Sequence, residues 1–168
     1  MTDLQLKTCC FTGHRAVPPE LSAMILSRAD RVIRQLYDRG IRYFGLGGAL
    51  GFDSQMAQLL FRLRQSELKD IKVILVYPFE GYTRHWTAEQ QWEHRQSLKN
   101  YDKIVCVSDV PGRDAYLARN RHLVNGSSVC VCAAAGCPHG WCRTRKQVIR
   151  IRIYFCLFFV NTVIPLLL

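Results

Sequence analysis

The chain has 168 residues, which is enough for one well-cored domain and leaves little room for a second. Hydrophobic residues make up 49% and charged residues 21%, a composition that excludes a disordered or fibrous protein. The formal net charge is +10, but it is uneven, because seven basic residues and no acidic residue follow Asp114. Basicity in a terminal segment is weak evidence for a nucleic-acid-binding surface, which needs Lys and Arg clustered on one face of a folded element.

No basic segment followed by an apolar run opens the sequence, so we expect no secretory signal and a cytoplasmic location. In that reducing compartment the eight cysteines are expected to be thiols rather than a disulfide framework. One cluster of soft ligands has enough members for a zinc ion but lacks the usual Cys-x-x-Cys pairs. It consists of Cys130, Cys132, Cys137, His139 and Cys142. We therefore expect neither a metal site nor a cofactor.

Short apolar runs alternate along the chain with segments of helical periodicity. In chain order we expect a strand at 6–11, a helix at 20–39, a strand at 42–46, a helix at 52–63, a strand at 73–77, a helix at 87–98, a strand at 103–108, a helix at 116–124 and a strand at 128–133. Strands that are apolar on both faces and alternate with helices require a parallel sheet covered on both sides. The predicted fold class is therefore α/β, a Rossmann-like three-layer sandwich with a mostly parallel sheet.

In such sheets ligands bind beyond the carboxyl ends of the strands, and the second predicted strand runs into a glycine-rich segment there. Residues 45–51 read GLGGALG, which resembles a dinucleotide fingerprint except that Leu50 stands where its third glycine belongs. Gly47 and Gly48 allow the backbone to approach an anion closely, and the following helix points N–H groups at the same place. The segment therefore predicts a phosphate-binding loop, with a tight turn that holds no ligand as the alternative. Asp53 either caps N–H groups or binds ribose hydroxyls.

The first predicted strand ends at Thr12, Gly13, His14 and Arg15. The planar guanidinium of Arg15 matches phosphate oxygens and keeps its charge, which predicts a phosphate contact, with a surface ion pair as the alternative. His14 has the chemistry of a general acid or base, but an isolated histidine is more often a hydrogen-bonded structural residue. No nucleophile elbow or Ser/His/Asp order accompanies it, so no catalytic residue is assigned.

These segments, read together with YPF at 77–79, YDKIVCVSD at 101–109 and YLARNRHLVN at 116–125, resemble the YpsA-like branch of the SLOG superfamily. The resemblance extends over about 7–133. This superfamily includes DprA and the LOG phosphoribohydrolases, and the resemblance implies a Rossmann-like fold associated with nucleotides or their derivatives. Carried over by position, it implies ligand-binding roles for Thr12, Gly13, Arg15, Gly47, Gly48, Asp53, Arg119 and Asn120.

The sequence departs from this pattern after Ala133. The Gly-Gly-Thr that opens the last helix of the family is missing, as is the PGG-x-GT-x-x-E stretch of the LOG enzymes. We therefore divide the chain into a Rossmann-like SLOG-type domain at 1–135 and a divergent basic and apolar tail at 136–168 that could complete the sheet. The uncharged run at 153–168 is shorter than the roughly 20 apolar residues of a membrane span. A sixth buried strand is the preferred interpretation of that run.

The sequence predicts a protein that binds or senses a nucleotide or a nucleotide-derived small molecule through the loops after the first two strands. One alternative is hydrolysis of a nucleotide N-glycosidic bond, with Asp53 or Glu80 as the carboxylate. A second alternative is binding of single-stranded nucleic acid, which the net charge and the DprA resemblance would allow. The identity of the ligand and a homo-oligomeric state are left open.

Overall fold

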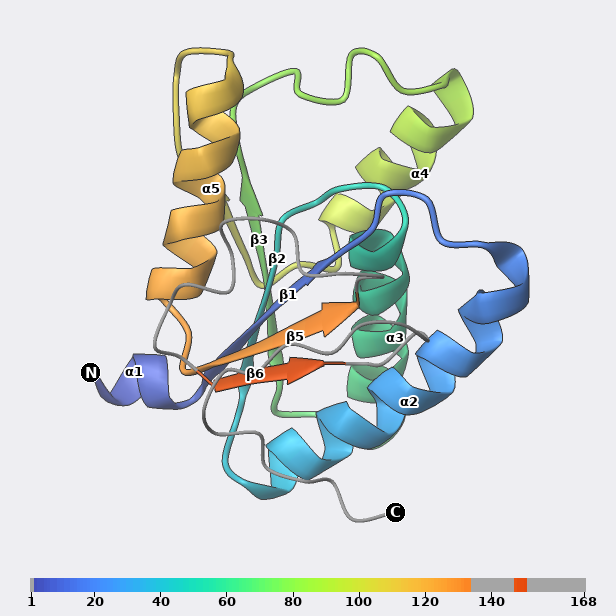
Figure 1. Cartoon of the computed structure of the whole chain (residues 1–168), viewed down its shortest axis with the longest axis vertical. Helices are drawn as coiled ribbons and strands as arrows, with labels where there is room; N and C mark the ends of the chain where they lie inside the picture. Colours follow the sequence, from blue (N-terminus) through green and yellow to red (C-terminus); the bar gives the residue numbers. More distant parts are fainter. Residues whose placement is uncertain (1, 134–146, 151–168) are drawn as a thin grey trace.

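The computed structural model describes residues 2–133 and 147–150. In chain order its elements are α1 (Asp3–Leu6), β1 (Thr8–Gly13), α2 (Pro19–Asp38), β2 (Tyr43–Leu46), α3 (Phe52–Ser66), β3 (Lys72–Tyr77), α4 (Ala88–Leu98), β4 (Lys103–Cys106), α5 (Arg113–Asn125), β5 (Val129–Ala133) and β6 (Gln147–Arg150). The strands form one parallel sheet in the order β4-β3-β2-β1-β5-β6 (Figure 1). The α/β, Rossmann-like fold class predicted from the sequence is confirmed.

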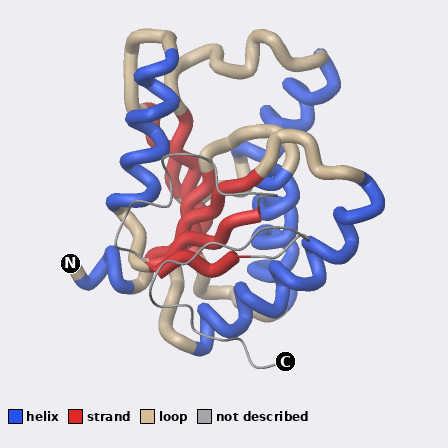
Figure 2. Tube along the Cα trace, viewed as in Figure 1, coloured by secondary structure: helices blue, strands red, loops and turns tan. Residues whose placement is uncertain are grey.

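Helices cover both faces of the sheet and produce three layers (Figures 1 and 2). The helices α2 and α3 pack on one face and against each other, and α5 packs on the opposite face. Strand β1 contributes side chains to the cores on both faces of the sheet, because successive side chains of a strand point to opposite faces. Cys9 and Phe11 join the larger core under α2 and α3, and Cys10 joins a smaller core with Leu123 and Val124 of α5.

All nine predicted elements agree with the structure to within three residues at each end, and the first strand, expected at 6–11, lies two residues later at Thr8–Gly13. Leu6 belongs to the short helix α1, whose first turn is capped by the side chain of Thr2. Thr12 and Gly13 were expected in a loop, yet they continue β1 because they pair with Cys132 and Ala133 of β5. Only His14 and Arg15 of that motif lie beyond the strand.

The segment at 136–168 contributes β6, which pairs with β5 in the same sheet. We expected a sixth strand later in the chain, within 153–168, and that run lies outside the described residues. Cys137, His139 and Cys142 of the candidate zinc cluster also lie outside them. Among the residues that are described, no three His, Cys, Asp or Glu side chains are placed to hold a metal ion. No helix in the described ranges is long and apolar enough to cross a membrane.

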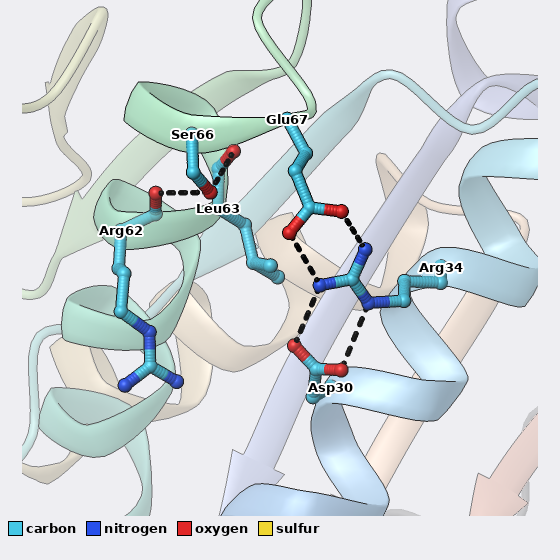
Figure 3. A network of polar contacts seen from close by, with 6 residues as sticks. All are labelled: Asp30, Arg34, Arg62, Leu63, Ser66 and Glu67. Atoms are coloured by element: carbon cyan, nitrogen blue, oxygen red, sulfur yellow. Dashed lines mark hydrogen bonds and ion pairs between the residues drawn. The ribbon is translucent and has the colours of Figure 1, made fainter.

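An ion-pair network joins α2 to the end of α3 on the surface (Figure 3). Arg34 donates from Nε to Asp30 at 2.9 Å and from Nη2 to Glu67 at 3.0 Å. The Arg34 side chain is 37% exposed and that of Glu67 is 56% exposed, so water and salt screen the attraction. The network therefore orients the two helices and adds little to the free energy of unfolding.

Gly13→Ala should lower the free energy of unfolding more than Gly45→Ala. A Cβ atom on Gly13 would lie 2.5 to 2.7 Å from three side-chain atoms of Phe52, which is fully buried. A Cβ atom on Gly45 would instead meet the flexible end of the Leu123 side chain at 3.0 Å. Overpacking a core costs about 1–3 kcal/mol, and we expect Gly13→Ala near the upper value. Urea midpoints measure both losses, and equal losses would show that Phe52 yields freely.

Candidate functional site

The loops after β1 and β2 touch each other at the carboxyl edge of the sheet. The backbone N–H of His14 donates to the carbonyl of Ala133 at 3.2 Å, and the carbonyl of His14 accepts from the N–H of Phe52 at 3.0 Å. Gly51 has φ +76°, and a Cβ atom there would lie 2.2 Å from the carbonyl oxygen of Arg15. The backbone of His14 therefore joins β1, β5 and the start of α3, while position 51 requires glycine.

Asp53, in the first turn of α3, is the buried centre of the glycine loop. Its Oδ2 atom accepts hydrogen bonds from the N–H groups of Gly47 at 3.0 Å and Ala49 at 3.4 Å. Burial raises the pKa of Asp53 above its ordinary value near 3.8, and the charge of Arg119 and the two N–H groups oppose that shift. In the structure Asp53 therefore caps the loop. The N–H groups of Gly47 and Ala49 are hydrogen-bonded to its carboxylate and are not free to bind a ligand.

Arg119 extends from α5 to the same loop and is also buried. Its Nη1 atom donates to the carbonyl of Gly47 at 2.6 Å and lies 3.9 Å from Oδ2 of Asp53. A Cβ atom on Gly47 would lie 1.7 Å from Nη1, so glycine is the residue that admits the guanidinium. Desolvation lowers the pKa of Arg119, and the Asp53 charge opposes this. The Nε atom of Arg119 is buried without a hydrogen-bond partner in the described part of the chain.

Arg15 is exposed at the same edge of the sheet. Its guanidinium carbon lies 5.8 Å from the ring centre of Tyr116 on α5. The positive charge of Arg15 lowers the pKa of both Asp53 and Arg119, although in each case burial has the larger effect on the pKa. Two guanidinium groups therefore act on one carboxylate at this point of the molecule.

Four further predicted site residues lie in different surroundings. Gly48 has φ +64°, and a Cβ atom there would lie 2.6 Å from the hydroxyl of Tyr82. The Oδ1 atom of Asn120 is buried and has no hydrogen-bond partner among the described residues. The side chain of His14 is exposed, and Thr12 lies within β1. The structure thus gathers Arg15, Gly47, Gly48, Asp53 and Arg119 around one loop.

A pocket of about 290 Å³ lies between α3 and α4, beside the glycine loop. From α3 it is lined by Ser54, Ala57, Gln58 and Phe61, which recur on one helical face. The opposite wall includes Trp86, His94 and Tyr101. The sequence did not predict this pocket, because the sites expected from it were the loops that follow strands. The signal that the sequence carries is the polar composition of α4, none of whose side chains is fully buried.

Trp86 and His94, which line the pocket, belong to a cluster of packed rings. The cluster also contains Tyr77 and Tyr82. The ring of Tyr82 stacks on Tyr77 with centres 5.5 Å apart, and its hydroxyl shares a hydrogen bond of 2.9 Å with Nε2 of His94. Trp86 meets both Tyr82 and His94 edge to face. Burial raises the pKa of Tyr82 and lowers the pKa of His94, so both side chains are uncharged at neutral pH.

Glu80, the second carboxylate considered for hydrolysis, is exposed and accepts a hydrogen bond from the Tyr77 hydroxyl. Asp53 lines the pocket between α3 and α4, whereas Glu80 does not. The two carboxylates therefore do not share that pocket.

A family model described as the YspA SLOG family matches residues 19–134, which is more than half of the chain. The chain belongs to this family. The matched segment includes Gly47, Gly48, Asp53, Arg119 and Asn120, while the motif at 12–15 precedes it. The resemblance to the YpsA-like branch of the SLOG superfamily is thereby confirmed.

Among curated relatives, a UPF0398 protein of Shouchella clausii is 27% identical over 79 residues, which cover 47% of this chain and 42% of that protein. A UPF0398 protein of Staphylococcus aureus is 24% identical over 75 residues, covering 45% and 40% respectively. The match therefore spans less than half the length of these relatives. Among solved structures, DNA processing protein A of Helicobacter pylori superposes with a TM-score of 0.50 and 20% identity, over 79% of this chain and 55% of that chain. This likeness shows a shared fold.

Arg119→Met should destabilise the folded protein strongly, because the buried carboxylate of Asp53 then loses the positive charge that α5 places next to it. Removing one partner of a buried ion pair costs about 3–5 kcal/mol. An Asp53→Asn, Arg119→Met double variant should lose less stability than the sum of the two single variants. Urea unfolding of the four proteins measures this difference, and strict additivity would show that the two side chains do not interact.

The loss caused by Arg119→Met should also depend on pH. Without the Arg119 charge, burial raises the pKa of Asp53 further in the folded state. A carboxyl with a raised folded pKa contributes stability below its unfolded value, near 3.8, and loses it as the pH rises through the folded pKa. The difference in urea midpoint between wild type and variant should therefore be larger at about pH 7 than at about pH 4. A difference independent of pH would show that Asp53 is uncharged in the wild-type fold.

Proposed function

We propose that this protein binds a nucleotide or a nucleotide-derived small molecule at the carboxyl edge of its sheet, and that it acts as a binding or sensing protein. The observation that carries the proposal is the local charge balance. The guanidiniums of Arg15 and Arg119 act together on the single buried carboxylate of Asp53. An excess of positive charge in a partly desolvated place favours an anionic ligand.

Guanidinium groups, rather than loop N–H groups, are the better candidates for contacting a phosphate. The N–H groups of Gly47 and Ala49 already donate to Asp53. Arg15 is exposed and able to reorient toward a ligand, and the buried Nε of Arg119 is a donor without a protein partner in the described ranges. Membership of a SLOG family supports a nucleotide as the source of that phosphate.

Single-stranded nucleic acid is a second candidate. The Helicobacter pylori protein that shares this fold binds single-stranded DNA. The same guanidiniums could contact the phosphates of a strand, and the net charge of +10 would favour the encounter. Binding of this kind should weaken steeply as salt is added and should strengthen with oligonucleotide length, whereas mononucleotide binding has no length dependence.

Arg15→Ala should weaken nucleoside monophosphate binding about tenfold or more, because charge-assisted hydrogen bonds contribute roughly 1.5–3 kcal/mol each. Isothermal titration against adenosine, guanosine, cytidine and uridine 5′-monophosphates measures the effect. A thermal-shift screen adds a second readout, since a ligand at 100 times its Kd stabilises a protein by about 2.7 kcal/mol.

Arg39→Ala is the matched control for that experiment. Arg39 is exposed at the end of α2, which leads into the amino end of β2 and so lies at the opposite edge of the sheet. Equal affinities of wild type and Arg15→Ala would remove Arg15 from the site. Retention of oligonucleotides without any mononucleotide binding would favour the second candidate. Release of free base from the monophosphates during incubation would identify an N-glycosidic hydrolase instead.

A further inference from the structure

The pocket between α3 and α4 differs in chemistry from the edge that carries Arg15 and Arg119. One cation, Lys99, lines it together with the carboxylates of Asp53 and Glu93, so its charge balance does not favour a phosphate. Its walls contain the aromatic rings of Phe61, Trp86 and Tyr101 and the amides of Gln58 and Asn100. Aromatic faces and amide groups together suit a planar ring that carries hydrogen-bonding atoms on its edges.

The size of the pocket limits what it can hold. Its volume of about 290 Å³ is at the lower end of the range for ligand pockets, which is roughly 300–1,000 Å³. A single small ring system fits this volume, whereas a dinucleotide does not. The ring would meet Trp86, which is half-buried and held by edge-to-face contacts with Tyr82 and His94. A preorganised aromatic face loses little freedom when a ligand stacks on it.

The pocket also adjoins the anion site. Asp53 lines the pocket, and its Oδ2 atom lies 3.9 Å from Nη1 of Arg119. The molecule therefore presents an aromatic wall, then a carboxylate, then guanidinium groups. A nucleoside 5′-monophosphate has the matching order of parts, with a planar base, ribose hydroxyls that can donate to a carboxylate, and a phosphate.

We propose that the pocket between α3 and α4 is the base-binding subsite of this protein and that its ligand is a mononucleotide or a derivative of one. The base stacks against Trp86, the ribose lies beside Asp53, and the phosphate faces Arg15 and Arg119. This assignment rests on the proposed function above and adds the subsite that would select the base.

Trp86→Ala should weaken binding of the best-bound nucleoside monophosphate by about tenfold, which corresponds to ~1.4 kcal/mol of lost stacking. Trp92→Ala is the matched control, because Trp92 lies on α4 but is 58% exposed and does not line the pocket. The same titrations with ribose 5-phosphate, which has no base, should be unaffected by Trp86→Ala and weakened by Arg15→Ala.

A second variant guards against misfolding of Trp86→Ala, since Trp86 also contacts Tyr82 and His94. Gln58→Trp places a large ring at the pocket wall from an exposed position of α3, and Gln65→Trp makes the same change at an exposed position that does not line the pocket. Gln58→Trp should weaken mononucleotide binding about tenfold, and Gln65→Trp should not. Circular dichroism confirms that each variant is folded.

The possible outcomes separate the two proposals. Loss of mononucleotide affinity in Trp86→Ala and Gln58→Trp, with both controls unchanged, supports the base subsite. A different result would overturn the base subsite and leave the proposed function standing: Arg15→Ala weakens mononucleotide binding, while a folded Gln58→Trp variant binds as tightly as wild type. If none of the four monophosphates binds the wild-type protein, both proposals are wrong.

Discussion

The arrangement of the carboxyl edge depends on the buried carboxylate of Asp53. It receives two N–H groups of the loop after β2, and Arg119 from α5 completes the contact by donating to the carbonyl of Gly47. Three separate segments of the chain are thereby fixed around one charge. A carboxylate this deeply buried is tolerated because N–H donors and a nearby guanidinium compensate for the lost hydration. Arg15 lies exposed at the same edge.

The glycines of this edge are required by packing against the protein itself. The space that a side chain would need is taken by Phe52 at Gly13, by Arg119 at Gly47, by Tyr82 at Gly48, and by the backbone of Arg15 at Gly51. A glycine-rich loop between a strand and a helix is often interpreted as a phosphate cradle. Here side chains and backbone of the protein occupy the space beside the glycines. Under the proposed function, recognition of an anion therefore falls to the arginine side chains next to the loop.

The polar helix α4 has a role that its composition alone did not reveal. None of its side chains is fully buried, although it begins with a capping box formed by Thr87 and Gln90. Instead of closing the hydrophobic core, it stands beside α3 and leaves a pocket with mixed polar and aromatic walls. The contact of Tyr82 with His94 and with the Gly48 region ties this pocket to the glycine loop. A change in the loop would therefore reach the pocket directly.

The sequence by itself determined the layered parallel fold, because apolar runs such as 73–77 and 128–133 alternate with helical segments and can be buried only in a sheet covered on both faces. It also located the glycine loop and Arg15 at strand ends. Tertiary structure gave Asp53 its capping role, because capping depends on where folding brings the N–H of Gly47. It also decided that Thr12 and Gly13 belong to β1, since their pairing partners lie in the distant strand β5. The pocket between α3 and α4 arises only from the packing of two helices, which no local pattern of residues specifies.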